Sequence, residues 1–177
     1  QVQLPFSVVR FAAEDGTPLS GWFIPGPEGA PVVLFCHGNA GNMSYCLEFV
    51  KSTRPLGVSW FLFDYRGYGR SGGRISESGF YRDCLAAWQT CRDRYCPDTG
   101  RLFLWGFSIG SAGALRVAGR ERPAGAILEA PLLSAGALAG ENPLLLFLHY
   151  FSTLSFDNAT AIRRCAAPKL LIHGTHD

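Results

Sequence analysis

The sequence lacks an excess of charge of either sign and lacks any long apolar run. Its 177 residues include 16 Lys and Arg against 14 Asp and Glu, so the formal net charge is only +2. Without a basic run, the chain is not expected to bind nucleic acid or a strongly anionic membrane surface. The longest apolar stretch, at 144–151, is about 8 residues long, far short of the roughly 20 that span a bilayer. The remaining composition, 47% apolar and 17% charged, is that of a globular protein.

Cysteine spacing gives no sign of a metal site. The six cysteines form no Cys-x-x-Cys pair and no Cys/His set with the spacing of zinc ligands. No metal or other cofactor is therefore expected, and most of the cysteines are expected to be buried free thiols. Cys91 and Cys96 are the one local pair for which the sequence leaves a disulfide open.

The chain is expected to form one domain over residues 1–177. It contains no repeat, linker or low-complexity segment, and its length suits a single core. Its first residue is Gln1 rather than Met, which leaves open a removed signal peptide or membrane anchor. The sequence thus does not decide between a cytoplasmic protein and one attached to a membrane through an N-terminal anchor. Because an alternating α/β domain rarely ends on the turn after a strand, further sequence is expected beyond Asp177.

Short β-rich runs alternate with helical stretches, which predicts an α/β fold with a mostly parallel sheet and helices on both faces. The first two runs flank the turn residues 14–16 and predict an N-terminal antiparallel hairpin. Residues 132–156 are apolar without clean periodicity and are expected to form a lid-like segment. Strands are expected at 6–11, 19–24, 32–36, 58–63, 102–105, 125–128 and 170–173, and helices at 43–54, 76–94, 109–120 and 158–164.

The segment 106–110, Gly-Phe-Ser-Ile-Gly, lies between an expected strand and an expected helix, which is the setting of a nucleophile elbow. So tight a turn leaves no room for flanking side chains, which explains a glycine two residues before and two after the serine. The serine backbone would be strained, with its Oγ exposed at the carboxyl edge of the sheet. The first N–H groups of the helix would favour an oxyanion there. Ser108 is therefore predicted to be a catalytic nucleophile.

The loop after the strand at 32–36 has the sequence His-Gly-Asn-Ala-Gly-Asn at 37–42. Acyl transfer needs two backbone N–H donors for the tetrahedral oxyanion, one from the residue after the nucleophile and one from this loop. Ile109 and Asn39 are predicted to supply them, and the glycines let the backbone approach a substrate. His37 is expected to hold the loop through its ring nitrogens rather than to take part in catalysis.

Three acidic residues that follow strands are candidates for the acid that orients a catalytic histidine. Asp177, after the last expected strand, takes the second place in the chain order serine, acid, histidine. Glu129 is the runner-up, because the end of its strand faces the same edge of the sheet. Asp64 opens the segment Asp-Tyr-Arg-Gly-Tyr-Gly. Its expected role is to order this loop by an ion pair or hydrogen bonds, with that of the acid as a weaker alternative.

Taken together, four motifs make the chain resemble the α/β-hydrolase-domain serine hydrolases. The motifs are HGNAGN at 37–42, DYRGYG at 64–69, GFSIG at 106–110 and LIHGTHD at 171–177. The chain is most similar to the branch that contains protein depalmitoylases, lipid esterases and many bacterial homologues. This resemblance, which runs from about residue 6 to the end, implies an eight-stranded sheet and assigns the acid to Asp177. It also places the catalytic histidine in a loop after the eighth strand.

Neither an eighth strand nor a histidine after it is found in the sequence. His37 and His173 precede glycines at strand ends and are expected to pack or to anchor loops. His176 is adjacent to Asp177, so it cannot easily lie between that acid and the serine. His149 in the lid-like segment is the remaining candidate. The general base is therefore expected roughly 30 residues beyond Asp177, as the resemblance implies.

The sequence predicts acyl transfer in two steps. Ser108 would attack a carbonyl carbon, the amides of Ile109 and Asn39 would hold the oxyanion, and water would hydrolyse the acyl-enzyme. The apolar lid-like segment favours an ester or thioester of an apolar acyl group as the small-molecule substrate. One alternative is a serine peptidase of the same fold. Another, which follows from the missing base, is a catalytically incomplete, hydrolase-like binding protein.

Overall fold

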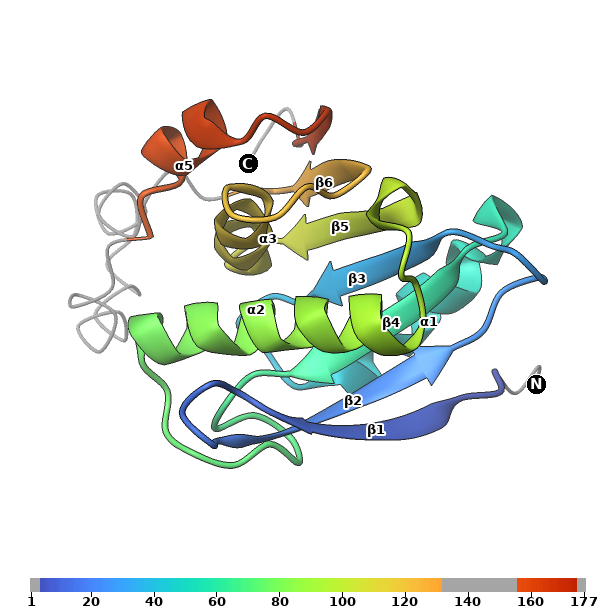
Figure 1. Cartoon of the computed structure of the whole chain (residues 1–177), viewed down its shortest axis with the longest axis horizontal. Helices are drawn as coiled ribbons and strands as arrows, with labels where there is room; N and C mark the ends of the chain where they lie inside the picture. The colour runs from blue at the N-terminus through green and yellow to red at the C-terminus, as the bar shows by residue number, and fades with distance from the viewer. Residues whose placement is uncertain (1–3, 132–155, 175–177) are drawn as a thin grey trace.

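The computed structural model describes residues 4–131 and 156–174, and within them a seven-stranded sheet forms the centre of the protein (Figure 1). The strands are β1 (Ser7–Ala12), β2 (Pro18–Ile24), β3 (Val32–Cys36), β4 (Ser59–Asp64), β5 (Leu102–Phe107), β6 (Gly125–Glu129) and β7 (Lys169–Ile172). Their order in the sheet is β1-β2-β4-β3-β5-β6-β7. The first two pairs in this order are antiparallel and the other four are parallel. The predicted mostly parallel sheet with an opening hairpin is confirmed.

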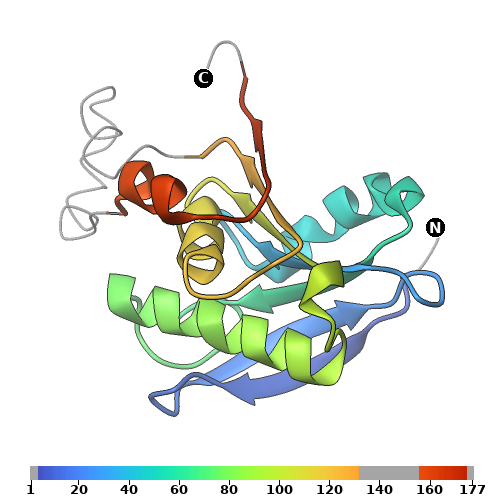
Figure 2. The ribbon, with the colours of Figure 1, turned by 45° about the horizontal axis from the view of Figure 1, so that its top comes forward.

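Helices cover both faces of the sheet. They are α1 (Leu47–Ser52), α2 (Glu77–Arg94), α3 (Gly110–Ala118) and α5 (Asn158–Arg164), with 3₁₀ turns η1 (Met43–Cys46), η2 (Arg54–Leu56) and η3 (Thr99–Arg101). Helices α2 and α3 lie on one face and α1 lies on the other (Figures 1 and 2). Helix α5 contacts α3 on its side of the sheet. Within the described residues, no helix is long and apolar enough to cross a bilayer.

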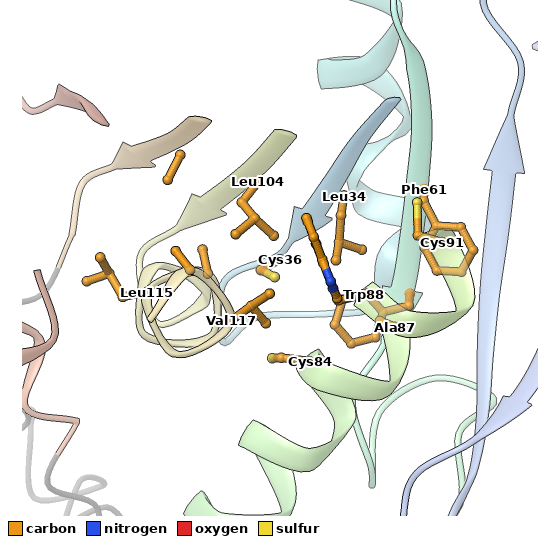
Figure 3. Close-up of a cluster of buried hydrophobic side chains, with 14 of the residues drawn as sticks. Leu34, Cys36, Phe61, Cys84, Ala87, Trp88, Cys91, Leu104, Leu115 and Val117 are labelled. Carbon is orange, nitrogen blue, oxygen red and sulfur yellow. The ribbon is translucent and has the colours of Figure 1, made fainter. Parts of the chain in front are cut away.

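The central strands are apolar throughout because both of their faces are buried. In β3, Leu34 and Cys36 share one core with Trp88 of α2 (Figure 3). The alternate residues Val33 and Phe35 belong to a second core on the face that α1 covers. The same alternation runs through β4 and β5, so each side of the sheet carries its own helix-covered core.

The expected helices are confirmed at 76–94 and 158–164, whereas the single helix expected at 43–54 is wrong. That stretch divides into η1, α1 and η2. At its start, the amide of Met43 donates to Asp64 Oδ1 at 2.7 Å, and Asn42 Oδ1 accepts from the amide of Ser44 at 2.9 Å. At its end, Pro55 has no N–H to continue a helical ladder, and the chain tightens into η2.

Cys91 and Cys96, the pair for which the sequence left a disulfide open, do not form one. Both residues are buried free thiols. Cys91 packs in the core from within α2, whereas Cys96 lies beyond the end of that helix with its Sγ 3.3 Å from the carbonyl oxygen of Asp98. Burial raises the pKa of the Cys91 thiol, which keeps it protonated and unreactive.

Candidate active site

The turn between β5 and α3 holds Ser108 in a left-handed backbone conformation, with φ of 53°. A residue with a side chain adopts this conformation at a cost in free energy, and it persists because surrounding contacts impose it. The amide of Ser108 donates to the carbonyl oxygen of Glu129 at 2.9 Å, and its own carbonyl accepts from the amide of Ser111 at 3.0 Å. The strained strand–turn–helix geometry expected from the sequence is present.

Two glycines allow α3 to begin directly against the sheet. A Cβ on Gly106 would lie 2.5 Å from the Cα of Ser111, and a Cβ on Gly110 would collide with the carbonyl group of Cys36. Side chains at either position would therefore push the helix away from the ends of β5 and β3. The first turn of α3 is in this way held against the loop that follows β3.

The loop at 37–42 lies beside Ser108. A Cβ on Gly38 would be 2.9 Å from Cδ1 of Phe107 and 3.7 Å from Cβ of Ser108. Asn39 is exposed in this loop, whereas Ile109 is buried at the start of α3. Ile109 thus directly follows the serine and Asn39 follows Gly38 in the neighbouring loop, and their role as oxyanion donors stays a prediction.

Two tyrosines of the segment after β4 hold the loop in place. Tyr65 Oη donates to the carbonyl oxygen of His37 at 2.8 Å, and Tyr68 Oη donates to Asn39 Oδ1 at 2.7 Å. Sequence reasoning missed both side chains. Their spacing of three residues, immediately after a strand that ends at the same edge as β3, is the signal that could have identified them.

The carboxylate of Asp64 links the same two segments by hydrogen bonds. This carboxylate is buried, with Oδ1 accepting from the amide of Met43 at 2.7 Å and Oδ2 from the amide of Arg70 at 3.3 Å. Gly69 has φ of 47°, and a Cβ there would collide with the carboxylate. Both oxygens are therefore bound to backbone amides, which is the loop-ordering role expected for Asp64.

His37 anchors the loop through one ring nitrogen. Its Nδ1 lies 2.7 Å from the carbonyl oxygen of Gly38. Its Nε2 lies 4.0 Å from Asp64 Oδ1 and has no hydrogen-bond partner within the described part of the chain. The side chain is buried against the ring of Tyr65, and this burial lowers the pKa of the imidazole. The neutral form is thus favoured.

Of the remaining acid and base candidates, Glu129 and His173 lie within the described residues. Glu129 is half-buried, and its Oε2 accepts from Nε1 of Trp105 at 2.9 Å. His173 is exposed, with Nδ1 3.1 Å from the carbonyl oxygen of Gly174. Asp177, His149, His176 and residues 132–155 of the predicted lid-like segment lie outside the described residues. In the described ranges no three His, Cys, Asp or Glu side chains gather as metal ligands.

An open pocket adjoins the site, with Ile109 in its lining. It is lined by Tyr65, Arg66, Tyr68, Ile75, Ser76, Glu77, Phe80, Ile109 and Phe156. No motif in the sequence predicted this pocket. Its lining comes from four separate parts of the chain, which only folding brings together.

The sequence matches a known protein family and several curated proteins. Residues 27–161 match the family model described as serine aminopeptidase, S33. The chain is 36% identical over 173 residues to an uncharacterized protein of Mycobacterium tuberculosis, covering 93% of this chain and 59% of that protein. It is 34% identical over 175 residues to alpha/beta hydrolase domain-containing protein 17C of Xenopus tropicalis, covering 96% of this chain and 54% of that protein.

Solved structures show the same fold. The esterase Pf2001 of Pyrococcus furiosus superposes with a TM-score of 0.75 at 23% identity, covering 95% of this chain and 68% of that one. An alpha-beta hydrolase of Vibrio vulnificus superposes with a TM-score of 0.78 at 22% identity, covering 94% and 62%. At such identities the likeness concerns the fold. The chain spans less than two thirds of the length of the curated relatives described above.

Proposed function

This chain belongs to the serine aminopeptidase S33 family of the α/β-hydrolases, and on that premise we propose that it is a serine hydrolase of esters or thioesters of apolar acyl groups. The observation that carries the proposal is the strained turn at Ser108. A non-glycine residue held at φ of 53° between a strand and a helix, beside a glycine-containing loop, is the geometry of an activated serine. The adjoining pocket favours an apolar acyl group.

In the proposed first step, Ser108 Oγ gives its proton to a histidine and forms a bond to the carbonyl carbon of the substrate. The carbonyl oxygen becomes an oxyanion that accepts hydrogen bonds from the amides of Ile109 and Asn39. The bond to the alcohol or thiol breaks, and the histidine returns the proton to this leaving group. Water then hydrolyses the acyl-enzyme by the same route. Asp177 is the proposed acid, and a loop that follows it is proposed to supply the histidine.

A serine peptidase is the second candidate, and the description of the matching family favours it. An aminopeptidase must bind the charged amino terminus of its substrate, which requires an acceptor close to the scissile bond. Glu77 is the acidic residue of the pocket lining, and its Oε1 already accepts from Tyr81 Oη and from the amide of Phe156, both at 3.1 Å. The surface of the pocket is otherwise mainly apolar, which favours the ester or thioester substrate.

A fluorophosphonate probe tests the proposal, because it labels only an activated serine. In the full-length protein we expect labelling that is lost in Ser108→Ala and kept in Ser52→Ala, a change at an exposed serine of α1. Full-length protein that stays unlabelled would contradict the enzyme proposal and favour the hydrolase-like binding protein. Comparing kcat/KM for p-nitrophenyl butanoate and for leucine p-nitroanilide then separates esterase from peptidase.

A further inference from the structure

The pocket beside Ser108 shares its walls with the proposed oxyanion hole. Ile109 lines it and directly follows the serine. Tyr65 and Tyr68 also line it, while their hydroxyl groups hold the loop of His37 and Asn39 at 2.8 and 2.7 Å. A substrate whose carbonyl oxygen lies between the amides of Ile109 and Asn39 would therefore have this pocket next to its carbonyl carbon.

The interior of the pocket is apolar. Phe80 and Phe156 are 5% and 3% exposed, whereas Ile75 is 42% exposed and lies toward the solvent. The charged residues of the lining already have partners within the protein. Arg66 binds the carboxylates of Asp83 and Asp15 at 2.9 and 2.8 Å, and Glu77 accepts from Tyr81 and Phe156. An apolar lining of this kind suits a hydrocarbon chain.

Phe156 is held in this pocket by an unusual set of contacts. Its φ is 36°, a left-handed conformation that is strained for an aromatic residue. Its amide donates to Glu77 Oε1 at 3.1 Å, and its carbonyl accepts from the amide of Asn158 at 2.7 Å. Its ring packs edge-on against Phe80 and Tyr81, with centroids 5.6 and 6.1 Å apart. Strain of this kind is concentrated where a ligand is bound.

We propose that Phe156 is a fixed wall of an acyl-binding pocket and that it limits the length of the acyl chain accepted at Ser108. The inference rests on the proposed function, because it assigns the substrate's acyl group to one side of the same site. Glu77 is a positioning residue here, since it acts by holding the backbone of Phe156 and not by contact with the chain.

The test is a series of p-nitrophenyl esters from acetyl to hexadecanoyl, hydrolysed by the full-length protein. Replacing Phe156 by Ala removes the wall, so the ratio of kcat/KM for the dodecanoyl ester to that for the butanoyl ester is expected to rise on the order of tenfold. The milder Phe156→Leu is expected to raise it less. Leu56→Ala, at an exposed residue of η2, is the control in which the ratio stays unchanged.

A second series, with a constant acetyl group and alcohols of increasing length, separates the acyl side from the leaving-group side. A ratio unchanged in both Phe156 variants, or a change confined to the alcohol series, would overturn the inference. Binding gives a readout that needs no turnover. In a Ser108→Ala background, adding Phe156→Ala is expected to tighten the binding of a fluorescent hexadecanoate analogue relative to an octanoate analogue. If fluorophosphonate labelling fails, the proposed function fails first, and the two failures are thus distinguishable.

Discussion

Single side chains at this site act mostly by holding backbone amides in place. Tyr68 Oη binds Asn39 Oδ1 at 2.7 Å, and Asp64 accepts from the amides of Met43 and Arg70. None of these bonds is proposed to involve the substrate. We propose that they fix where the amide of Asn39 lies when an oxyanion forms, since preorganised donors of this kind act chiefly on the transition state.

Replacing Tyr68 by Phe is expected to lower kcat on the order of tenfold and to leave KM nearly unchanged. The change removes one oxygen and its hydrogen bond to Asn39, a loss of about 1 kcal/mol, and keeps the ring in the pocket wall. Steady-state hydrolysis of p-nitrophenyl butanoate measures both constants. Tyr45→Phe, at a ring that is 76% exposed, serves as the matched control. A rise in KM with unchanged kcat would show that Tyr68 acts in ground-state binding instead.

At the scale of elements, one arginine joins three parts of the fold. Arg66, after β4, donates from its guanidinium to Asp83 of α2 and to Asp15 of the β1–β2 turn. Asp83 is fully buried and Arg66 is 7% exposed. The carboxylates of Asp83 and Asp15 raise the pKa of Arg66 further. The buried guanidinium of Arg66 thus links helix α2, the β1–β2 turn and the loop beside the site.

Asp83→Asn is expected to lower the free energy of unfolding by about 3–5 kcal/mol, because it leaves the guanidinium of Arg66 without its buried counter-charge. Urea unfolding followed by circular dichroism measures the loss. Asp93→Asn removes the partner of an exposed pair with Arg92 on the same helix and is expected to cost less than about 1 kcal/mol. An equal loss in the free energy of unfolding for the two variants would contradict a stabilising role for the ion pair of Arg66 and Asp83.

For the whole molecule, the strands in the middle of the sheet are buried and the edge strand β7 is exposed. The central strands β3, β4 and β5 are buried on both faces. At one edge, within the described residues, β7 pairs with β6 alone, and Leu170, Leu171 and Ile172 are 55%, 54% and 41% exposed. The structure is therefore expected to be most resistant to opening in the middle of the sheet, where His37 is buried at the end of β3.

Global unfolding is linked to pH through His37. Burial lowers the pKa of this residue in the folded state, whereas an unfolded histidine titrates near 6.5. Above that pH neither state takes up the proton. As the pH falls below it, the unfolded state binds a proton that the folded state excludes, and stability is lost.

Between pH 7.5 and 5.5 the free energy of unfolding is therefore expected to fall more steeply in the natural chain than in His37→Gln. The difference in slope is at most about 1.4 kcal/mol per pH unit below pH 6.5. Urea titrations at several pH values measure it, and the comparison of slopes is independent of any constant loss from the substitution itself. Parallel curves for the two proteins would contradict a lowered pKa at His37.

Local chemistry made much of the fold predictable. The strands of the centre are short continuous apolar runs, and the helix at 76–94 begins at Ser76, whose Oγ caps the amide of Gly79 at 3.2 Å. The turn at Ser108 was predictable for the same reason, since glycine on both sides is what a strand–turn–helix junction needs. The prediction of a single helix at 43–54 was wrong because the start of that segment is held by a distant residue. The amide of Met43 donates to Asp64, more than ten residues away in the chain.

What the sequence determined by itself is the α/β fold, the strained serine and the neighbouring glycine loop, because each depends on residues close together in the chain. Tertiary structure alone decided which side chains build the loop contacts and the pocket beside that serine. Tyr68 reaches Asn39 across 29 positions and Glu77 reaches Phe156 across 79. Such contacts depend on strand order and on how helices pack across the sheet. No local pattern of apolar residues or turns encodes them.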